Sequence, residues 1–252
     1  MNPPSGELEL TGRITTASNA TFLGTLGDVE VVYKPTEGER PLWDFPGVVL
    51  AHREVAAHAV SEALEWSVVP LTWLGEGPFG EGMLQLWQDV DPAVEAVDLV
   101  PSDEIPEAGW RRVFEGHDDD DRRVSLIHED STALRRMAVF DVIVNNADRK
   151  GGHVLAMPDG HRYGVDHGIT FHVEPKLRTV LWGWIGEPLA DDELAAVARL
   201  RSALGGALGA SLEPLLPAEE LAALDARCAR LLADGVFPSP SGDMPPIPYP
   251  LF

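Results

Sequence analysis

The sequence predicts an α+β fold with two lobes: a small β-rich N-terminal lobe that contains one helix, and a mainly helical C-terminal lobe. Three observations predict it. Short β-prone runs alternate with turn residues over residues 7–34, apolar residues recur every four positions between residues 55 and 64, and two apolar helical stripes lie beyond residue 190. The composition changes after Gln88, so we assign residues 1–88 to the first lobe and residues 89–252 to the second.

The first lobe begins with a predicted antiparallel meander over residues 7–34. A loop rich in proline and glycine follows over residues 35–46. The four-residue apolar period then predicts an amphipathic helix that ends near Trp66. One helix therefore separates the meander from the remaining strands of this lobe.

Two further strands are predicted at residues 68–73 and 83–87. The segment between them, residues 75–80, fits the pattern G-x-G-x-x-G. A dinucleotide site of that kind needs a helix directly after the glycines, because the helix N-terminus binds the phosphates. A strand-like run follows here, so we interpret the segment as a connection between two strands.

The second lobe begins with an acidic stretch, residues 89–131, for which we expect irregular structure. Within it, residues 117–121 read H-D-D-D-D, which indicates a solvated loop. Residues 132–144 are apolar almost all round, and this pattern predicts a helix buried in the middle of the lobe.

Two more helices are predicted near the end of the chain, over residues 191–204 and over residues 217–235. The single cysteine, Cys228, falls on the apolar stripe of the second helix, so we expect a core residue and not a nucleophile. The tail from Phe237 onward is rich in proline, and we expect it to be extended and to wrap the surface.

The charge and composition exclude several classes of function. The chain has 41 acidic and 19 basic residues, a formal net charge of −22 and a pI near 4.5. So acidic a surface repels nucleic acid and anionic lipid, and we expect neither as a partner. With one cysteine, no secretory start and no apolar run of about 18 residues, the sequence predicts a cytoplasmic protein without membrane insertion.

Two aspartates follow the predicted central helix in a pattern that indicates chemistry. Asp148 lies in a polar loop directly after that helix, a short apolar strand leaves the loop, and a second apolar strand ends at Asp166. We therefore expect both carboxylates to face one cleft. Phosphoryl transfer needs such a pair, one carboxylate to orient or deprotonate the attacking hydroxyl and one to hold a metal ion against the triphosphate.

Residues 148–153 read D-R-K-G-G-H, and residues 166–168 read D-H-G. These motifs resemble those of the kinase superfamily, and within it the phosphatidylinositol 3- and 4-kinase-like branch, whose catalytic loop reads D-R-H-x-x-N and whose metal motif reads D-x-G. The resemblance implies a protein-kinase-like fold, with Asp148 as the catalytic carboxylate, Lys150 near the γ-phosphate and Asp166 as a metal ligand. His153 stands where the family has a metal-binding Asn, and imidazole suits Mn²⁺ or Zn²⁺ better than Mg²⁺.

The resemblance extends into the first lobe. Residues 31–35, V-V-Y-K-P, are similar to the phosphate-binding strand of type II phosphatidylinositol 4-kinases, which implies that Lys34 binds the α- and β-phosphates. Glu54 opens the predicted helix where the family has the Glu that pairs with this Lys, and residues 69–72, V-P-L-T, resemble the V-P-x-T strand. The resemblance covers about residues 10–170, and the chain looks most like uncharacterised actinobacterial phosphatidylinositol-kinase-like proteins.

Further nucleotide contacts are implied by the same resemblance. The loop over residues 16–21 has the place of the phosphate-covering loop, but with Ser18 and Asn19 instead of glycines, so hydroxyl and backbone N–H groups would hold the nucleotide. Residues 85–88, Q-L-W-Q, would form the hinge that contacts adenine through its backbone, with Gln85 and Trp87 as nucleotide-binding residues.

Two functions follow from the resemblance. The first is an ATP-dependent kinase that uses Mg²⁺ or Mn²⁺ and phosphorylates a protein hydroxyl, its own included, or a small molecule. The second, motivated by His153 and by the glycine-poor loop, is a nucleotide-binding pseudokinase or regulatory module without turnover. We do not expect a lipid acceptor, because the segment after Asp166 lacks the basic residues that bind anionic headgroups.

Two interpretations without phosphoryl transfer stay open. Lys34 and Glu54 are also compatible with solvated charges, and the two aspartates with caps or turns. Alternatively, four histidines within twenty residues form a zinc site, although no pair has the helical H-x-x-x-H spacing of a zinc protease; they are His153, His161, His167 and His172.

Overall fold

The computed structural model describes residues 3–15, 17, 19–241 and 245–252. Its N-terminal part holds a five-stranded antiparallel sheet of order β1-β2-β3-β5-β4. The predicted meander and the two later strands are thereby confirmed, and so is the strand connection at residues 75–80, where β4 and β5 form a hairpin. The strands are β1 (Leu8–Arg13), β2 (Phe22–Leu26), β3 (Val29–Pro35), β4 (Thr72–Gly77) and β5 (Gly80–Leu86).

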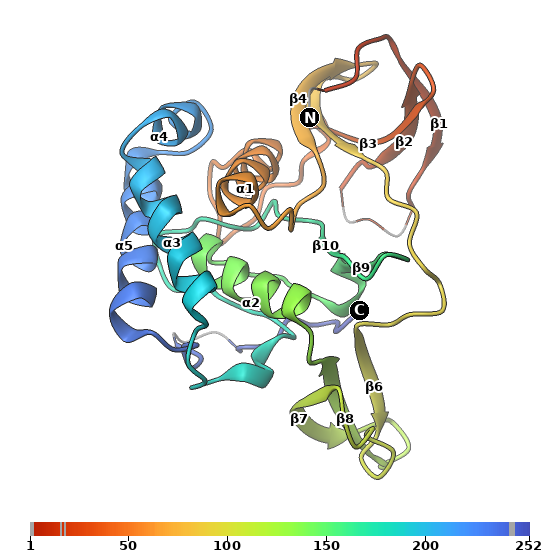
Figure 1. Cartoon of the computed structure of the whole chain (residues 1–252). Helices are drawn as coiled ribbons and strands as arrows, with labels where there is room; N and C mark the ends of the chain where they lie inside the picture. The colour runs from red at the N-terminus through yellow and green to blue at the C-terminus, as the bar shows by residue number, and fades with distance from the viewer. Residues whose placement is uncertain (1–2, 16, 18, 242–244) are drawn as a thin grey trace.

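The predicted helix of this part is α1 (Leu50–Leu64), which lies between the sheet and the helices of the C-terminal part (Figure 1). The chain then enters β4 at Thr72, four residues later than expected from Val68. The hydrogen bonds of the intervening segment explain why β4 begins later than expected. Val69 donates its N–H to the Ser61 hydroxyl and the Val68 carbonyl accepts from Gly164, so this segment is bound to α1 and to a later strand instead of the sheet.

Beyond residue 131 the C-terminal part contains the predicted helices. Its helices are α2 (Thr132–Val144), α3 (Asp191–Leu204), α4 (Ala207–Leu212) and α5 (Ala218–Asp234). The short α4 was not predicted. Cys228 is fully buried on α5, which confirms its assignment to the core. The α+β class, with a β-rich N-terminal part that contains one helix and a helical C-terminal part, is therefore confirmed (Figure 1).

The main hydrophobic core joins residues of α1, α2, α3 and α5, whereas the N-terminal sheet has a small cluster of its own around Val31, Tyr33 and Leu84. Helix α1 thus packs its buried apolar side chains with the C-terminal helices. A division of the chain at residue 88 stays a prediction.

The expectation of irregular structure over residues 89–131 was wrong. This stretch contains a three-stranded antiparallel sheet of order β6-β8-β7, formed by β6 (Val97–Pro101), β7 (Trp110–His117) and β8 (Arg123–Glu129). Its charged residues gather in the turns. Asp118, for example, accepts backbone N–H groups of Asp120 and Arg122 between β7 and β8. The high average charge of the stretch hid a short buried run in β8, residues 125–128, which fixes the sheet against the core.

A buried histidine of β8 makes the stability of the fold depend on pH. His128 is fully buried, its Nε2 accepts the N–H of Gly183, and burial lowers its pKa to about 4. In the unfolded chain the pKa is about 6.5. The neutral ring therefore stabilises the fold fully above pH 6.5, and this contribution is lost as the pH falls toward 4.

We expect the free energy of unfolding from urea titrations to fall by about 3 kcal/mol between pH 7 and pH 4 through His128 alone. A His128→Gln variant should lose about one proton from the pH slope in this window. An unchanged slope in the variant would show that His128 does not carry this effect. The matched control is His161→Gln, because that ring makes its hydrogen bond at an exposed position.

No helix in the part of the chain that the structure describes has the length and apolar character needed to cross a bilayer.

Candidate active site

Lys34 connects three elements of the fold. It lies on β3 next to Tyr33, whose side chain is fully buried in the cluster of the sheet, so the alternation of the strand directs Lys34 to the opposite face. Its Nζ lies 2.8 Å from Oε1 of Glu54 on α1 and 2.6 Å from Oδ1 of Asp166, which follows β10 (Arg162–Gly164). The predicted pairing of Lys34 with Glu54 is thus present in the structure.

The loop between α2 and β9 (Val154–Ala156) brings the other predicted residues to the same place. Nε2 of His153 lies 3.5 Å from Oδ2 of Asp166, and Nδ1 of His153 lies 2.9 Å from the carbonyl oxygen of Asp148. Nζ of Lys150 lies 3.2 Å from Oδ2 of Asp148. Together with Lys34 and Glu54 these residues form one connected cluster, which we call the Lys34–Asp148 cluster.

Electrostatics set the protonation of the cluster. The charge of Lys34 holds the pKa of Asp166 well below its usual range. Burial would lower the pKa of Lys34, but the charges of Asp166 and Glu54 outweigh it and raise that pKa. Burial raises the pKa of Asp148, as a proton-accepting carboxylate requires, and lowers the pKa of His153. The His153 ring is therefore neutral near pH 7.

The donor atoms that face each other in the cluster fit a divalent cation. Since Nδ1 of neutral His153 donates to the Asp148 carbonyl, its Nε2 carries a lone pair, and this lone pair faces the carboxylate of Asp166. A divalent cation bound between them would have both atoms as ligands. Among the described residues no group of three or more acidic, histidine or cysteine side chains could hold a metal alone, so a cation bound here would take its further ligands from phosphate or water oxygens.

A buried network supports the candidate catalytic loop and was not predicted. Arg149 is fully buried, as is Asp141 on α2, and the two form an ion pair with Nη2 and Oδ1 2.9 Å apart. The remaining guanidinium N–H groups donate to the carbonyls of His153 and Val165 and to Nε2 of His167. One side chain thus fixes both the loop of Asp148 and the strand end that carries Asp166.

His167 extends this network to Glu54. Its backbone N–H donates to Oε2 of Glu54 at 2.8 Å, while Oε1 of the same carboxylate binds Lys34. Because Arg149 donates to Nε2, we assign the ring proton of His167 to Nδ1. The sequence held one signal for this network, a single aspartate, Asp141, in a helix that is otherwise apolar almost all round.

The residues predicted to contact the nucleotide lie as follows. Ser18 is outside the described residues. The side-chain oxygen of Asn19 accepts the backbone N–H of Arg40, and the side chain of Gln85 is buried and donates to the Thr72 hydroxyl. The backbone N–H of Trp87 donates to the Glu30 carbonyl. Gln85 thus has its side chain in the sheet, and the adenine-binding hinge stays a prediction.

The positions of the four histidines give little support to the alternative zinc site. Nε2 of His161 lies 2.8 Å from the carbonyl of Ser67, and Nδ1 of His172 accepts the N–H of Glu174. His167 is engaged by Arg149. His153 is therefore the histidine that faces the aspartates of the cluster.

The proline-rich tail ends beside the candidate catalytic loop, as Figure 1 shows at the label C. The Pro246 carbonyl accepts the N–H of Thr179, and the Leu251 carbonyl accepts the N–H of Gly151 at 2.8 Å. The ring of Phe252 packs so closely on Gly151 that a Cβ there would lie 2.4 Å from it. Gly151 is thus the point where the tail meets the loop of Asp148.

We expect a Gly151→Ala variant to displace the Phe252 ring and loosen the tail, because the added methyl group overlaps that ring. The global stability should change little, since Phe252 is a half-exposed terminal side chain. Amide hydrogen exchange over residues 245–252 should quicken. Gly152→Ala is the matched control, since its Cβ would meet only ordinary van der Waals contact at 3.8 Å. Equal exchange in both variants would contradict the close packing.

These features define an α+β protein in which a lysine of the N-terminal sheet meets a glutamate of α1 and one aspartate of the C-terminal part, Asp166. Asp148 joins this cluster through Lys150 and His153. The sequence is 51% identical over 260 residues to Protein Rv2133c of Mycobacterium tuberculosis, across 98% of this chain and 93% of that protein. The chain therefore belongs to the family of Protein Rv2133c. No protein-family model matches the sequence.

Among solved structures, the chain is similar to the Helicobacter pylori proinflammatory kinase CtkA, with a TM-score of 0.44 and 12% identity over 93% of this chain and 95% of that chain. We infer nothing about activity from a similarity at this level.

Proposed function

We propose that this protein is a cytoplasmic ATP-dependent phosphotransferase. One observation carries the proposal: Lys34 bridges Glu54 and Asp166, and Asp148 belongs to the same cluster. Positioning and charge stabilisation account for most of the catalysis of phosphoryl transfer, and this cluster has a cation for the phosphates, a carboxylate for a metal ion and a second carboxylate for the attacking hydroxyl.

In the proposed reaction Lys34 exchanges Asp166 for the α- and β-phosphates of ATP while Glu54 keeps its ammonium group in place. Asp148 accepts the proton of the acceptor hydroxyl as the new O–P bond forms, and the bond between the γ-phosphorus and the β-bridging oxygen breaks to release ADP. Lys150, which pairs with Asp148, offsets charge on the transferred phosphoryl group. Each of these roles uses a residue of the Lys34–Asp148 cluster.

Asp166 and His153 would hold the divalent cation, which when bound neutralises charge on the phosphates. The nitrogen ligand favours Mn²⁺ over Mg²⁺ relative to a site made of oxygens alone. We therefore propose ATP with Mg²⁺ or Mn²⁺ as the cofactor pair, with the higher rate in Mn²⁺.

The acceptor that we propose is a protein hydroxyl or a small molecule. A net charge of −22 repels an anionic membrane surface, which argues against a phosphoinositide acceptor. Specific phosphorylation of phosphatidylinositol in liposomes would overturn this part of the proposal.

The proposal is tested by two measurements on the purified protein. Calorimetric titration with ATP should show binding that requires a divalent cation, because Lys34 and Lys150 are the cations of a cluster that also holds three carboxylates. Radiolabelled ATP should then transfer phosphate to the protein itself or to a member of an acceptor panel. Binding without any turnover would favour the alternative of a pseudokinase, which His153 motivates, and the absence of binding would exclude both functions.

A further inference from the structure

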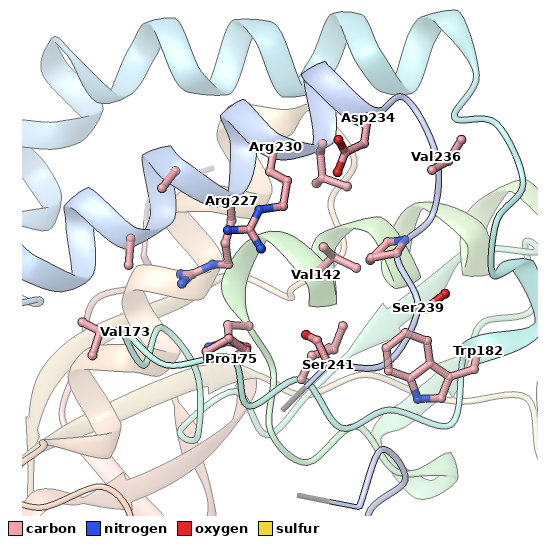
Figure 2. Close-up of a pocket in the computed structure, with 16 residues that line it drawn as sticks. Val142, Val173, Pro175, Trp182, Arg227, Arg230, Asp234, Val236, Ser239 and Ser241 are labelled. Atoms are coloured by element: carbon pink, nitrogen blue, oxygen red, sulfur yellow. The ribbon is translucent and has the colours of Figure 1, made fainter. Parts of the chain in front are cut away.

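A cavity of about 170 Å³ lies outside the Lys34–Asp148 cluster, between α5, the C-terminal half of α2 and the two segments around residues 175 and 238 (Figure 2). None of the cluster residues lines it. Its walls are largely apolar and include the Trp182 ring and two prolines, Pro175 and Pro238. A cavity of about 150 Å³ can enclose a benzene ring, so the space suits one flat apolar ring.

Two arginines of α5, Arg227 and Arg230, extend into this space, as Figure 2 shows. Arg227 donates Nε to the Ile143 carbonyl at 2.7 Å and Nη1 to the His172 carbonyl at 3.2 Å. Its Nη2 is buried and has no hydrogen-bond partner within the described ranges. Burial lowers the pKa of Arg227 to about 10, and the neighbouring Cys228 and Glu220 offset this only in part.

Acidic residues outnumber basic ones by 41 to 19 in this chain, so carboxylate partners for arginines are plentiful. Arginines of α2 and α3, such as Arg135 and Arg199, have carboxylate partners. Neither Arg227 nor Arg230 has one within 4.0 Å in residues 3–15, 17, 19–241 and 245–252, although Asp234 lines the same cavity. Arg230 is exposed and can be solvated, whereas the buried N–H group of Arg227 without a partner points to a ligand that supplies an acceptor.

We propose that this cavity binds a small aromatic carboxylate, whose ring lies against Trp182 and whose anionic group is held by Arg227 and Arg230. This inference goes beyond the proposed phosphotransferase and does not depend on it. An aromatic carboxylate satisfies both halves of the cavity, since the ring replaces water at the apolar wall and the carboxylate accepts the N–H groups of the guanidinium.

The test uses benzoate as the probe and benzamide as its uncharged counterpart. Binding is followed in two-dimensional NMR spectra by the indole N–H signal of Trp182, assigned with a Trp182→Phe variant. We expect benzoate to shift this signal saturably and benzamide to bind at least about tenfold more weakly, because hydrogen bonds to charged groups contribute about 1.5–3 kcal/mol. An unshifted Trp182 signal, or equal affinity for the two probes, overturns the proposal.

Arg230→Met is the informative variant, because Arg230 is exposed and Arg227 also supports α2 through the Ile143 carbonyl. It should weaken benzoate binding about tenfold. Arg199→Met on α3 is the matched control and should bind as the wild type does. Since Asp243 lies outside the described residues, Asp243→Asn is titrated as well. Equal or tighter binding supports an anion site, whereas loss of binding in this variant, or no effect of Arg230→Met, contradicts it.

Discussion

An Asp148→Asn variant is expected to bind ATP as the wild type does and to lose about 10²- to 10⁴-fold in phosphotransfer, the range typical of a missing general base. The amide has the shape of the carboxylate but cannot accept the proton of the acceptor hydroxyl, and it also loses the charge that faces Lys150. The rate of transfer in single turnovers, measured beside ATP affinity by calorimetry, separates the chemical step from binding.

Asp159→Asn is the control for this experiment, because Asp159 is an exposed residue of the turn between β9 and β10, where it accepts the N–H of His161. It should leave the rate unchanged. If Asp148→Asn transfers phosphate as fast as this control, Asp148 is not the proton acceptor. A lowered ATP affinity in Asp148→Asn would mean instead that the carboxylate serves binding.

An Arg149→Met variant is expected to lose about 3–5 kcal/mol of unfolding free energy, since it leaves the buried charge of Asp141 without a partner. The carbonyls of His153 and Val165 lose their donor as well. Arg149→Lys should recover only part of the loss, because one ammonium group cannot reach Asp141, His167 and both carbonyls together. Urea unfolding monitored by tryptophan fluorescence measures these differences.

The double variant Arg149→Met/Asp141→Leu distinguishes an unpaired charge from a loss of packing. It should be more stable than Arg149→Met alone, because both members of the ion pair are then apolar. Arg123→Met is the control, since this exposed arginine of β8 should leave the stability nearly unchanged. A similarly small effect of Arg149→Met would show that the network does not hold the loop.

Most helices and the N-terminal sheet could be predicted because their patterns are local. The four-residue apolar period predicted α1. The apolar faces and recognisable ends of α2, α3 and α5 predicted these three helices. The β6-β8-β7 sheet was missed because charges in its turns dominate the composition of the stretch. A strand of seven residues with only four buried ones gives a weak signal against such a background.

The candidate site was predicted in part for a different reason. Lys34, Glu54, Asp148 and Asp166 stood out through their resemblance to a family pattern, and the structure brings them within one set of contacts. The nucleotide contacts of Asn19, Gln85 and Trp87 stay predictions, since their polar groups bind other parts of the chain here.

The sequence by itself determined the acidic character of the protein, its α+β class and the residue types of the cluster for which we propose phosphate binding. Only the tertiary structure decided that Arg149 lies at zero exposure between Asp141 and His167, that the tail packs on Gly151, and that two arginines of α5 share a cavity with Trp182. The reason is physical. Charge and hydrophobic periodicity can be read from residues that are neighbours in the sequence. Burial and ion pairing depend on residues that are distant in the chain and come together only after folding.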